Sequence, residues 1–131
     1  AGRVITLELE PTHAEFARTW IANSDQAGKI EVRIGDAVKT LADIPDGDTD
    51  AIFLDADKPG YIKYFEHAMR LLRPGGVLLA DNVLAGGLVA DGKGETEVAI
   101  RAFLDMTMAE PNMHSVIVPL GDGIFLGVKN V

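Results

Sequence analysis

"AIFLDADKPGYIKY", residues 51 to 64, decides the fold of this chain. Its first four residues are all apolar, which is typical of a strand that is covered on both faces of a parallel sheet. Three charged residues, Asp55, Asp57 and Lys58, follow directly. Charges at the end of a buried strand are costly to desolvate, so we expect these three to have a chemical role.

Strand-like and helical stretches alternate along the rest of the chain. We predict strands at residues 4–8, 29–34, 51–54 and 77–80, and helices at 11–28, 37–41, 59–72 and 95–109. Thr12 and Glu15 have the spacing of a capping box for the first helix, and Gly28 is placed to end it. "SVIVPLGDGIFLGVKN" (115–130) predicts two strands joined by a tight Gly-Asp-Gly turn, hence an antiparallel hairpin. This order predicts an α/β fold in one domain, residues 1–131.

The composition excludes several classes of function. The 131 residues include no cysteine, so disulfides, thiol nucleophiles and cysteine-bound zinc are excluded. A formal net charge of -8 opposes binding to nucleic acids or anionic membranes. No apolar run approaches the ~18 residues of a membrane span, and no basic and apolar leader opens the chain. We therefore expect a cytoplasmic protein that binds neither nucleic acid nor membrane.

Acidic residues follow four predicted strands in succession. In parallel α/β sheets, ligands bind beyond the carboxyl ends of the strands. The residues concerned are Glu8, Asp36, Asp55 and Asp81. Glu8 fits a carboxylate that binds ribose hydroxyls, or a solvated turn residue. Asp36 fits either a ligand contact or a helix N-cap, since Asp is favoured at that position.

Asp55 and Asp81 point to a metal site. If their strands are neighbours, the two strand ends lie about 5 Å apart, and two like charges at that distance require a cation. Together with the amide of Asn82 they offer hard oxygen donors, which suit magnesium, calcium or manganese better than zinc. Lys58 fits a base that deprotonates a substrate hydroxyl, or an ion-pair partner of Asp57.

Five stretches together resemble one family, the cation-dependent O-methyltransferases, which include the catechol and caffeoyl-coenzyme A enzymes and their bacterial relatives. The stretches are RVITLELEPTHAEFAR (3–18), IGDA (34–37), FLDADKPGY (53–61), LRPGGVLLADNVLAGG (72–87) and PLGDGIFL (119–126). The resemblance implies a Rossmann-like class I methyltransferase sheet of seven strands, the last one antiparallel. It also implies an S-adenosylmethionine-dependent enzyme that methylates a small phenol or catechol and forms a homodimer.

The resemblance assigns roles to individual residues. Asp55, Asp81 and Asn82 match the metal ligands, with Mg²⁺ as the expected ion. Lys58 matches the proposed catalytic base, beside Asp55. The positions that match cofactor contacts are Glu8 for the ribose, Asp36 and Ala37 for the adenine, and Asp55, Asp57 and Tyr64. Some relatives place a substrate-binding Asn in the loop where this chain has Gly86.

One departure from the family pattern concerns the start of the chain. The first strand and its glycine-rich turn should precede Glu8 by about 20 residues, and only seven residues precede it here. We therefore expect an incomplete sheet, in which the first two strands separate from the rest. We also expect this chain alone to keep the metal site but to bind the cofactor poorly.

Three other classes of protein remain as alternatives. A phospho-accepting receiver domain has a similar length and an Asp after an apolar strand, but this chain has Asp81 where a receiver has Ser or Thr. A nicotinamide-dependent dehydrogenase would also use Glu8, although no G-x-G-x-x-G motif is present. The third alternative is a methyltransferase-like interaction module without activity.

Overall fold

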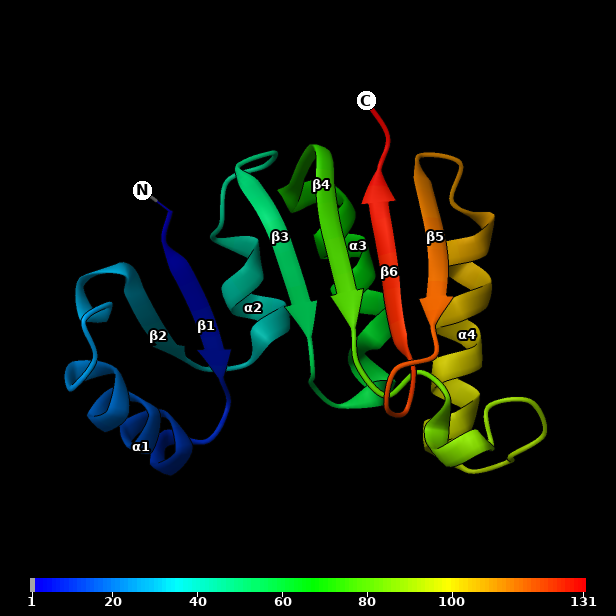
Figure 1. The fold of residues 1–131 in the computed structure, drawn as a ribbon, viewed down its shortest axis with the longest axis horizontal. Helices are drawn as coiled ribbons and strands as arrows, with labels where there is room; N and C mark the ends of the chain where they lie inside the picture. Colours follow the sequence, from blue (N-terminus) through cyan, green and yellow to red (C-terminus); the bar gives the residue numbers. More distant parts are fainter. Residues whose placement is uncertain (1) are drawn as a thin grey trace. The chain divides into compact units, whose positions relative to one another are not determined.

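The computed structural model describes residues 2–131, and its helices and strands alternate for most of the chain (Figure 1). Their order is β1 (Val4–Glu8), α1 (Pro11–Ala22), β2 (Ile30–Ile34), α2 (Ala37–Ala42), β3 (Thr49–Leu54), α3 (Tyr61–Leu71), β4 (Leu72–Ala80), α4 (Glu95–Ala109), β5 (Met113–Val118) and β6 (Ile124–Lys129). Short 3₁₀ turns occur at η1 (Ala27–Lys29), η2 (Lys58–Gly60) and η3 (Ala85–Gly87). The chain forms two compact units, of which the first ends at Ile44 and the second begins at Pro45.

The first unit contains a two-stranded parallel sheet. Strands β1 and β2 pair from Val4↔Ile30 to Glu8↔Ile34, and they form a sheet of their own. The expectation that the first two strands separate from the rest is therefore confirmed at the level of hydrogen bonding. Helix α1 is joined to β2 by Arg18, which donates a hydrogen bond to the carbonyl of Val32 at 2.9 Å.

The predicted capping box and the predicted end of the first helix are both wrong. Helix α1 begins at Pro11, with Glu10 as its N-cap and without a side-chain cap. Proline is favoured at the first helical position because its fixed φ suits the helix and its missing N–H is not needed there. Thr12 therefore lies inside the helix. The helix ends at Ala22, six residues before Gly28, where the Asn23 amide donates to the carbonyl of Thr19 at 2.8 Å.

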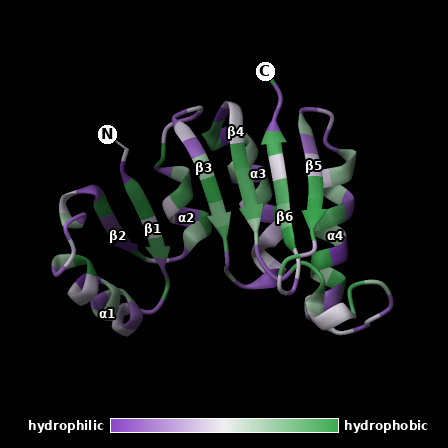
Figure 2. Ribbon diagram, viewed as in Figure 1, coloured by the Kyte–Doolittle hydropathy of each residue, from purple (hydrophilic) through white to green (hydrophobic). Residues whose placement is uncertain are grey.

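The second unit contains a four-stranded mixed sheet in the order β3-β4-β6-β5. Strands β3 and β4 are parallel, whereas β6 runs antiparallel to both β4 and β5. The predicted antiparallel hairpin is thus confirmed, since β5 pairs with β6 from Met113↔Lys129 to Val118↔Ile124. The parts of β3 and β4 that lead to their carboxyl ends are hydrophobic, and hydrophilic residues begin beyond them (Figure 2).

Aromatic rings form the centre of the core between this sheet and helices α3 and α4. Phe103 of α4 makes edge-to-face contacts with Tyr61, Phe65 and Phe125, at centroid distances of 5.2, 6.0 and 5.1 Å. All four residues are at most 1% exposed. Edge-to-face pairs of this kind add to the free energy gained by burial. The start of α3, which follows the charged stretch, is therefore held firmly in the core.

Helix α3 is shorter than predicted, and β4 is longer. The helix spans Tyr61–Leu71, because Pro59 and Gly60 belong to the preceding 3₁₀ turn. Strand β4 begins at once with Leu72, five residues before the predicted start of this strand at residue 77. The pairing of β3 with β4 is irregular between Thr49 and Ala51, which accommodates these extra residues.

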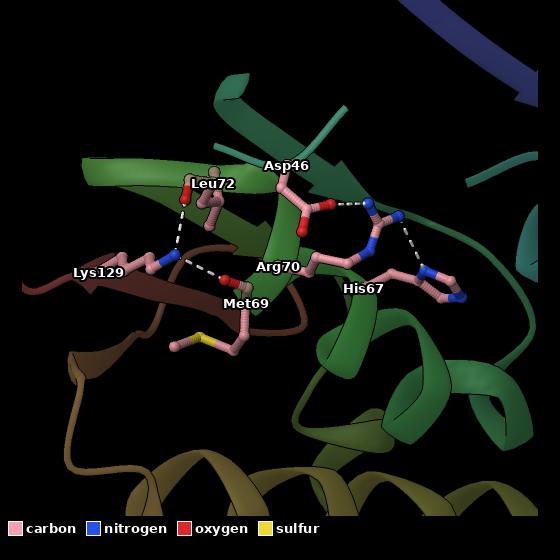
Figure 3. A network of polar contacts seen from close by, with 6 residues as sticks. All are labelled: Asp46, His67, Met69, Arg70, Leu72 and Lys129. Carbon is pink, nitrogen blue, oxygen red and sulfur yellow. Dashed lines mark hydrogen bonds and ion pairs between the residues drawn. The ribbon is translucent and has the colours of Figure 1, made fainter. Parts of the chain in front are cut away.

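A lysine from the last strand holds the C-terminal end of α3. Lys129 Nζ donates hydrogen bonds to the carbonyls of Met69 and Leu72 at 2.7 and 2.8 Å (Figure 3). The final carbonyls of a helix have no partner within the helix, and the helix dipole favours a cation there. In the same region Arg70 is bonded to Asp46 and lies 3.4 Å from His67 Nδ1.

Candidate functional site

The ends of β3 and β4 lie side by side. The register of this parallel pair ends at Leu54↔Ala80, and the backbone N–H of Asp81 then donates to the carbonyl of Leu54 at 3.0 Å. Asp55 and Asp81 therefore directly follow paired residues at the same edge of the sheet. Neighbouring strands lie about 4.8 Å apart. The condition on which the predicted metal site depends, that the two strands are neighbours, is met.

Asn82 turns the chain sharply after Asp81. Its φ of 58° is in the left-handed region, which Asn tolerates better than most residues. The N–H of Asn82 also donates to Asp81 Oδ1 at 2.8 Å. Asp81 and Asn82 are both half-buried, and Asp55 is exposed. The turn therefore ends the alternation of the strand directly after Asp81.

The donor set at this edge fits a hard divalent cation. Asp55 and Asp81 supply carboxylates and Asn82 supplies an amide carbonyl, which are oxygen ligands of the kind magnesium and calcium prefer. Within residues 2–131, no cluster of three or more His, Cys, Asp or Glu side chains is arranged to hold a metal. The predicted set contains two carboxylates and one Asn amide, so it is not a cluster of that composition. This metal site stays a prediction.

Lys58 reaches across to the end of β4. Its Nζ donates to the backbone carbonyl of Asp81 at 2.7 Å and is also bonded to the Tyr61 hydroxyl. Burial lowers the pKa of Lys58, because it disfavours the charged ammonium, and the nearby carboxylates of Asp55, Asp81 and Asp122 oppose that shift. A lysine with a lowered pKa is better suited to accept a proton near neutral pH.

Tyr61 has a role that its sequence pattern did not reveal. In the sequence it is only the last residue of FLDADKPGY and part of the predicted helix 59–72. Its hydroxyl lies 3.2 Å from the carbonyl of Leu54 and 3.3 Å from that of Asp81. Burial, together with the negative charges of Asp55 and Asp81, raises the pKa of Tyr61, so the hydroxyl stays neutral. Its spacing of three residues from Lys58 was the signal that could have indicated this contact, because residues three apart on a helical turn are neighbours.

Asp57 and Tyr64 form a second pair at the start of α3. The Tyr64 hydroxyl donates to Asp57 Oδ1 at 2.6 Å, and the N–H of Gly60 donates to Asp57 Oδ2 at 3.0 Å. Asp57 thereby caps the 3₁₀ turn Lys58–Gly60. Its side chain is fixed but exposed, while Tyr64 is buried. The contact of both residues with a cofactor stays a prediction.

Asp122, in the turn between β5 and β6, was not among the predicted site residues. Both of its carboxylate oxygens accept from the N–H of Gly86, and its carbonyl accepts from the N–H of Leu84 at 2.9 Å. The carbonyl of Gly123 accepts from Val83 at 3.1 Å. The loop that follows Asp81 and Asn82 is therefore attached to the hairpin turn. Only the tertiary fold brings these segments together.

The remaining predicted residues, Glu8, Asp36 and Ala37, belong to the first unit. Glu8 ends β1, and its Oε1 accepts from the N–H of Glu10 at 2.9 Å. Asp36 is the N-cap of α2, with Oδ1 accepting from the N–H of Val38 at 2.9 Å, so the capping interpretation of Asp36 is confirmed. Ala37 is the first residue of α2. Their contacts with a cofactor stay predictions.

Comparison with known proteins decides the family. A family model described as O-methyltransferase matches residues 1–130. This chain belongs to the O-methyltransferase family. The match includes the stretch on which the receiver alternative rested, and the closing hairpin of this O-methyltransferase chain replaces the helix that a receiver has there.

Relatives and solved structures agree with this assignment. The chain is 38% identical over 118 residues to a catechol O-methyltransferase of Mycobacterium tuberculosis, covering 89% of this chain and 54% of the relative. A catechol O-methyltransferase of Niastella koreensis is 42% identical over 103 residues, covering 76% and 46%. The O-methyltransferase of Bacillus cereus, solved in complex with SAH, superposes with a TM-score of 0.91 at 34% identity, covering 98% and 63%.

These matches show the fold of the O-methyltransferase chain and the share of its relatives' length that it covers. It has the fold of class I S-adenosylmethionine-dependent methyltransferases, as predicted. It spans about half the length of the curated relatives that it matches. Among residues 2–131, no helix is both long and apolar enough to cross a membrane.

Proposed function

We propose that the protein transfers the methyl group of S-adenosylmethionine to a hydroxyl of a catechol or another small phenol, with a divalent cation held by Asp55, Asp81 and Asn82. One observation carries the proposal. The N–H of Asp81 bonds to the carbonyl of Leu54, and Lys58 Nζ bonds to the carbonyl of Asp81, so two carboxylates and a candidate base gather at one sheet edge.

The acceptor chemistry explains why such a site is needed. A phenolic hydroxyl has a pKa of about 10, and ionisation at neutral pH requires a lowering of about three units, or roughly 4 kcal/mol. A divalent cation, when bound, supplies this stabilisation of the phenolate charge. Magnesium is the ion that we propose, because the donors are hard oxygens and few enough to leave room for the acceptor.

Lys58 is the proposed base. Its Nζ takes the proton from the acceptor hydroxyl, the C–O bond forms as the methyl C–S bond breaks, and the sulfonium becomes a neutral thioether. The lowered pKa of Lys58 supports this role because it increases the fraction of free amine. Positioning supplies most of the remaining rate enhancement, since both reactants are held in line.

We also propose residues that contact the cofactor. Glu8 has a carboxylate fixed at the end of β1 by the N–H of Glu10, which suits hydrogen bonds from ribose hydroxyls. Asp36 and Ala37 are proposed for the adenine, and Asp57 and Tyr64 for further contacts. We also propose a homodimer, as the family resemblance implies, and a cytoplasmic location, as the composition suggests. The 131-residue chain alone should bind S-adenosylmethionine weakly, and calorimetry that shows micromolar binding would contradict this point.

The test is methyl transfer from labelled S-adenosylmethionine to catechol by the full protein. We expect activity with Mg²⁺, loss with EDTA, and recovery when Mg²⁺ is restored. Asp55→Asn and Asp81→Asn should each lower activity more than about 100-fold, because partners outside the ligand shell already change such sites by 10–100-fold. Asp105→Asn, an equal change of charge at an exposed position of α4, should keep wild-type activity.

A second measurement does not depend on turnover. Mg²⁺ that binds only the folded protein raises its unfolding free energy, by about 2.7 kcal/mol at one hundred times the dissociation constant. This increase should be present in the wild type and in Asp105→Asn, and absent in Asp81→Asn. A folded protein that Mg²⁺ does not stabilise, and that methylates no phenol, would favour the interaction module without activity.

A further inference from the structure

The Tyr61 hydroxyl lies close to the carboxyl ends of β3 and β4 in the second unit. Tyr61 is fully buried, and its hydroxyl is within hydrogen-bond distance of the carbonyls of Leu54 and Asp81. It is also bonded to Lys58 Nζ, which bonds in turn to the carbonyl of Asp81. A single buried hydroxyl thus connects both strand ends with Lys58.

We propose that Tyr61 is a positioning residue, whose hydroxyl fixes Lys58 Nζ at the reacting edge of the sheet. This inference rests on the proposed function, in which Lys58 is the base. It assigns to Tyr61 no contact with substrate or cofactor, because the ring is buried in the core and only its hydroxyl reaches Lys58.

The length of a lysine side chain makes such a support necessary. Four rotatable bonds carry about 2 kcal/mol of rotamer entropy, so an unsupported Nζ samples many positions. Two acceptors, the Asp81 carbonyl and the Tyr61 hydroxyl, define its position instead. The Tyr61 ring cannot move to follow a mobile lysine, because Phe103 lies edge-on against it at 5.2 Å.

The hydrogen-bonding capacity of the groups agrees with this role. The single proton of the Tyr61 hydroxyl can go to either backbone carbonyl, which leaves its oxygen free to accept from Lys58. A neutral amine has two N–H donors, and the Asp81 carbonyl and the Tyr61 oxygen accept both. The lone pair of the amine is then left for a proton from outside this pair of acceptors. The two acceptors thus fix where Nζ lies, and they can accept from the amine and from the ammonium alike.

The hydroxyl can be tested apart from the ring. Lys58 Nζ also lies 4.3 Å from the centroid of the Tyr61 ring, a cation–π contact that Tyr61→Phe preserves. Tyr64→Phe is the matched variant, because it removes a hydroxyl from the same helix that bonds to Asp57 instead of Lys58. The two substitutions delete the same atom at positions three residues apart.

Steady-state kinetics of the full protein gives the first readout. Tyr61→Phe should lower kcat for catechol methylation by about 10- to 100-fold, the effect expected of a reactive group displaced by an ångström. Its KM for catechol and for S-adenosylmethionine should change little. Tyr64→Phe should act mainly on the KM for S-adenosylmethionine. Wild-type kcat in Tyr61→Phe, or losses in KM alone, would overturn the proposal.

Fluorine NMR gives the second readout, which requires neither turnover nor a Tyr61 variant that folds. In protein labelled with 3-fluorotyrosine, Lys58→Met should shift the resonance of Tyr61 and leave that of Tyr64 in place, with Tyr64→Phe used for assignment. An unchanged Tyr61 resonance would show that Tyr61 does not hold Lys58, and would overturn the proposal. If the wild type methylates no phenol, the proposed function fails, whereas this shift still reports whether Tyr61 positions Lys58.

Discussion

Asp122 and Gly86 are 36 residues apart in the sequence, yet both carboxylate oxygens of Asp122 accept from the Gly86 N–H, at 2.8 and 3.0 Å. Gly86 has a φ of 63°, and Ala85 before it is also in the left-handed region at 51°. The loop after Asn82 thus has an unusual backbone that it keeps through contacts with the β5–β6 turn. Asp122 connects the stability of this loop with the geometry of the candidate metal site.

We expect Asp122→Ala to lower the free energy of unfolding by about 1 kcal/mol, the usual contribution of a hydrogen bond near the surface. Asp122→Asn should lose less, because the amide carbonyl can still accept from Gly86. Urea denaturation measures both values. Asp105→Ala is the control for removal of an exposed acidic side chain, and equal stability of the Asp122→Ala and Asp105→Ala variants would contradict the role of Asp122.

The contact of Lys129 with the end of α3 gives a second prediction. Lys129→Met keeps the apolar stem but leaves the carbonyls of Met69 and Leu72 without the ammonium (Figure 3). We expect a loss of about 1–2 kcal/mol in the free energy of unfolding. Lys63→Met, at an exposed position of the same helix, should change stability by no more than about 0.5 kcal/mol. Thermal or urea unfolding of the two variants decides the point.

The sequence predicted those features that depend on local pattern. The apolar runs before Asp55 and Asp81 and the glycines around Asp122 were sufficient to predict strands β3 and β4 and the hairpin. The prediction that the first of these runs is covered on both faces is wrong, because Ala51 and Phe53 of β3 are exposed and only Leu54 of this strand is buried. Boundaries were harder to predict, because Pro11 starts α1 before Thr12 can cap it, and because β4 follows α3 without a loop. In both places two sequence signals favoured different boundaries, and the local pattern did not show which of them the fold would follow.

The sequence predicted those residues of the candidate site that directly follow apolar runs. It missed the residues whose contacts form only when distant segments come together in the fold. Asp55, Asp81 and Lys58 stand next to apolar runs, and chemistry is expected there. The hydroxyl of Tyr61 and the carboxylate of Asp122 acquire their roles from partners 20 and 36 residues away. A single sequence does not show such pairs, since nothing in the local pattern separates them from a core residue and a turn residue.

An exposed ion pair in the first unit gives a prediction of pH dependence. The hydrogen bond from Arg33 holds the pKa of the Glu31 carboxyl below its ordinary value of 4.5. A depressed pKa contributes stability that is present above pH 4.5 and is lost as the pH falls through the folded value. An NMR titration should therefore show Glu31 titrating below 4.5. Arg33→Met should return its pKa toward 4.5, whereas Lys29→Met should leave it unchanged.

A substitution of Gly123, in the β5–β6 turn, tests whether this turn holds the loop that follows Asn82. A Cβ at this position would lie 2.5 Å from Leu84 Cγ, and the φ of 79° is in the left-handed region. Gly47 has a similar φ of 67°, but a Cβ there would meet nothing within 4 Å. Gly47→Ala should therefore lose only the cost of a left-handed alanine, about 1–2 kcal/mol.

Gly123→Ala should lose that amount and, in addition, about 1 kcal/mol or more for the displacement of Leu84. The difference between the two variants isolates the contact, because the backbone strain is common to both. Leu84 also donates its N–H to the carbonyl of Asp122, so its displacement loosens the loop that carries Asn82. Urea unfolding of both variants measures the difference. Equal losses would mean that Leu84 moves aside freely, and that the hairpin turn does not hold this loop through side-chain packing.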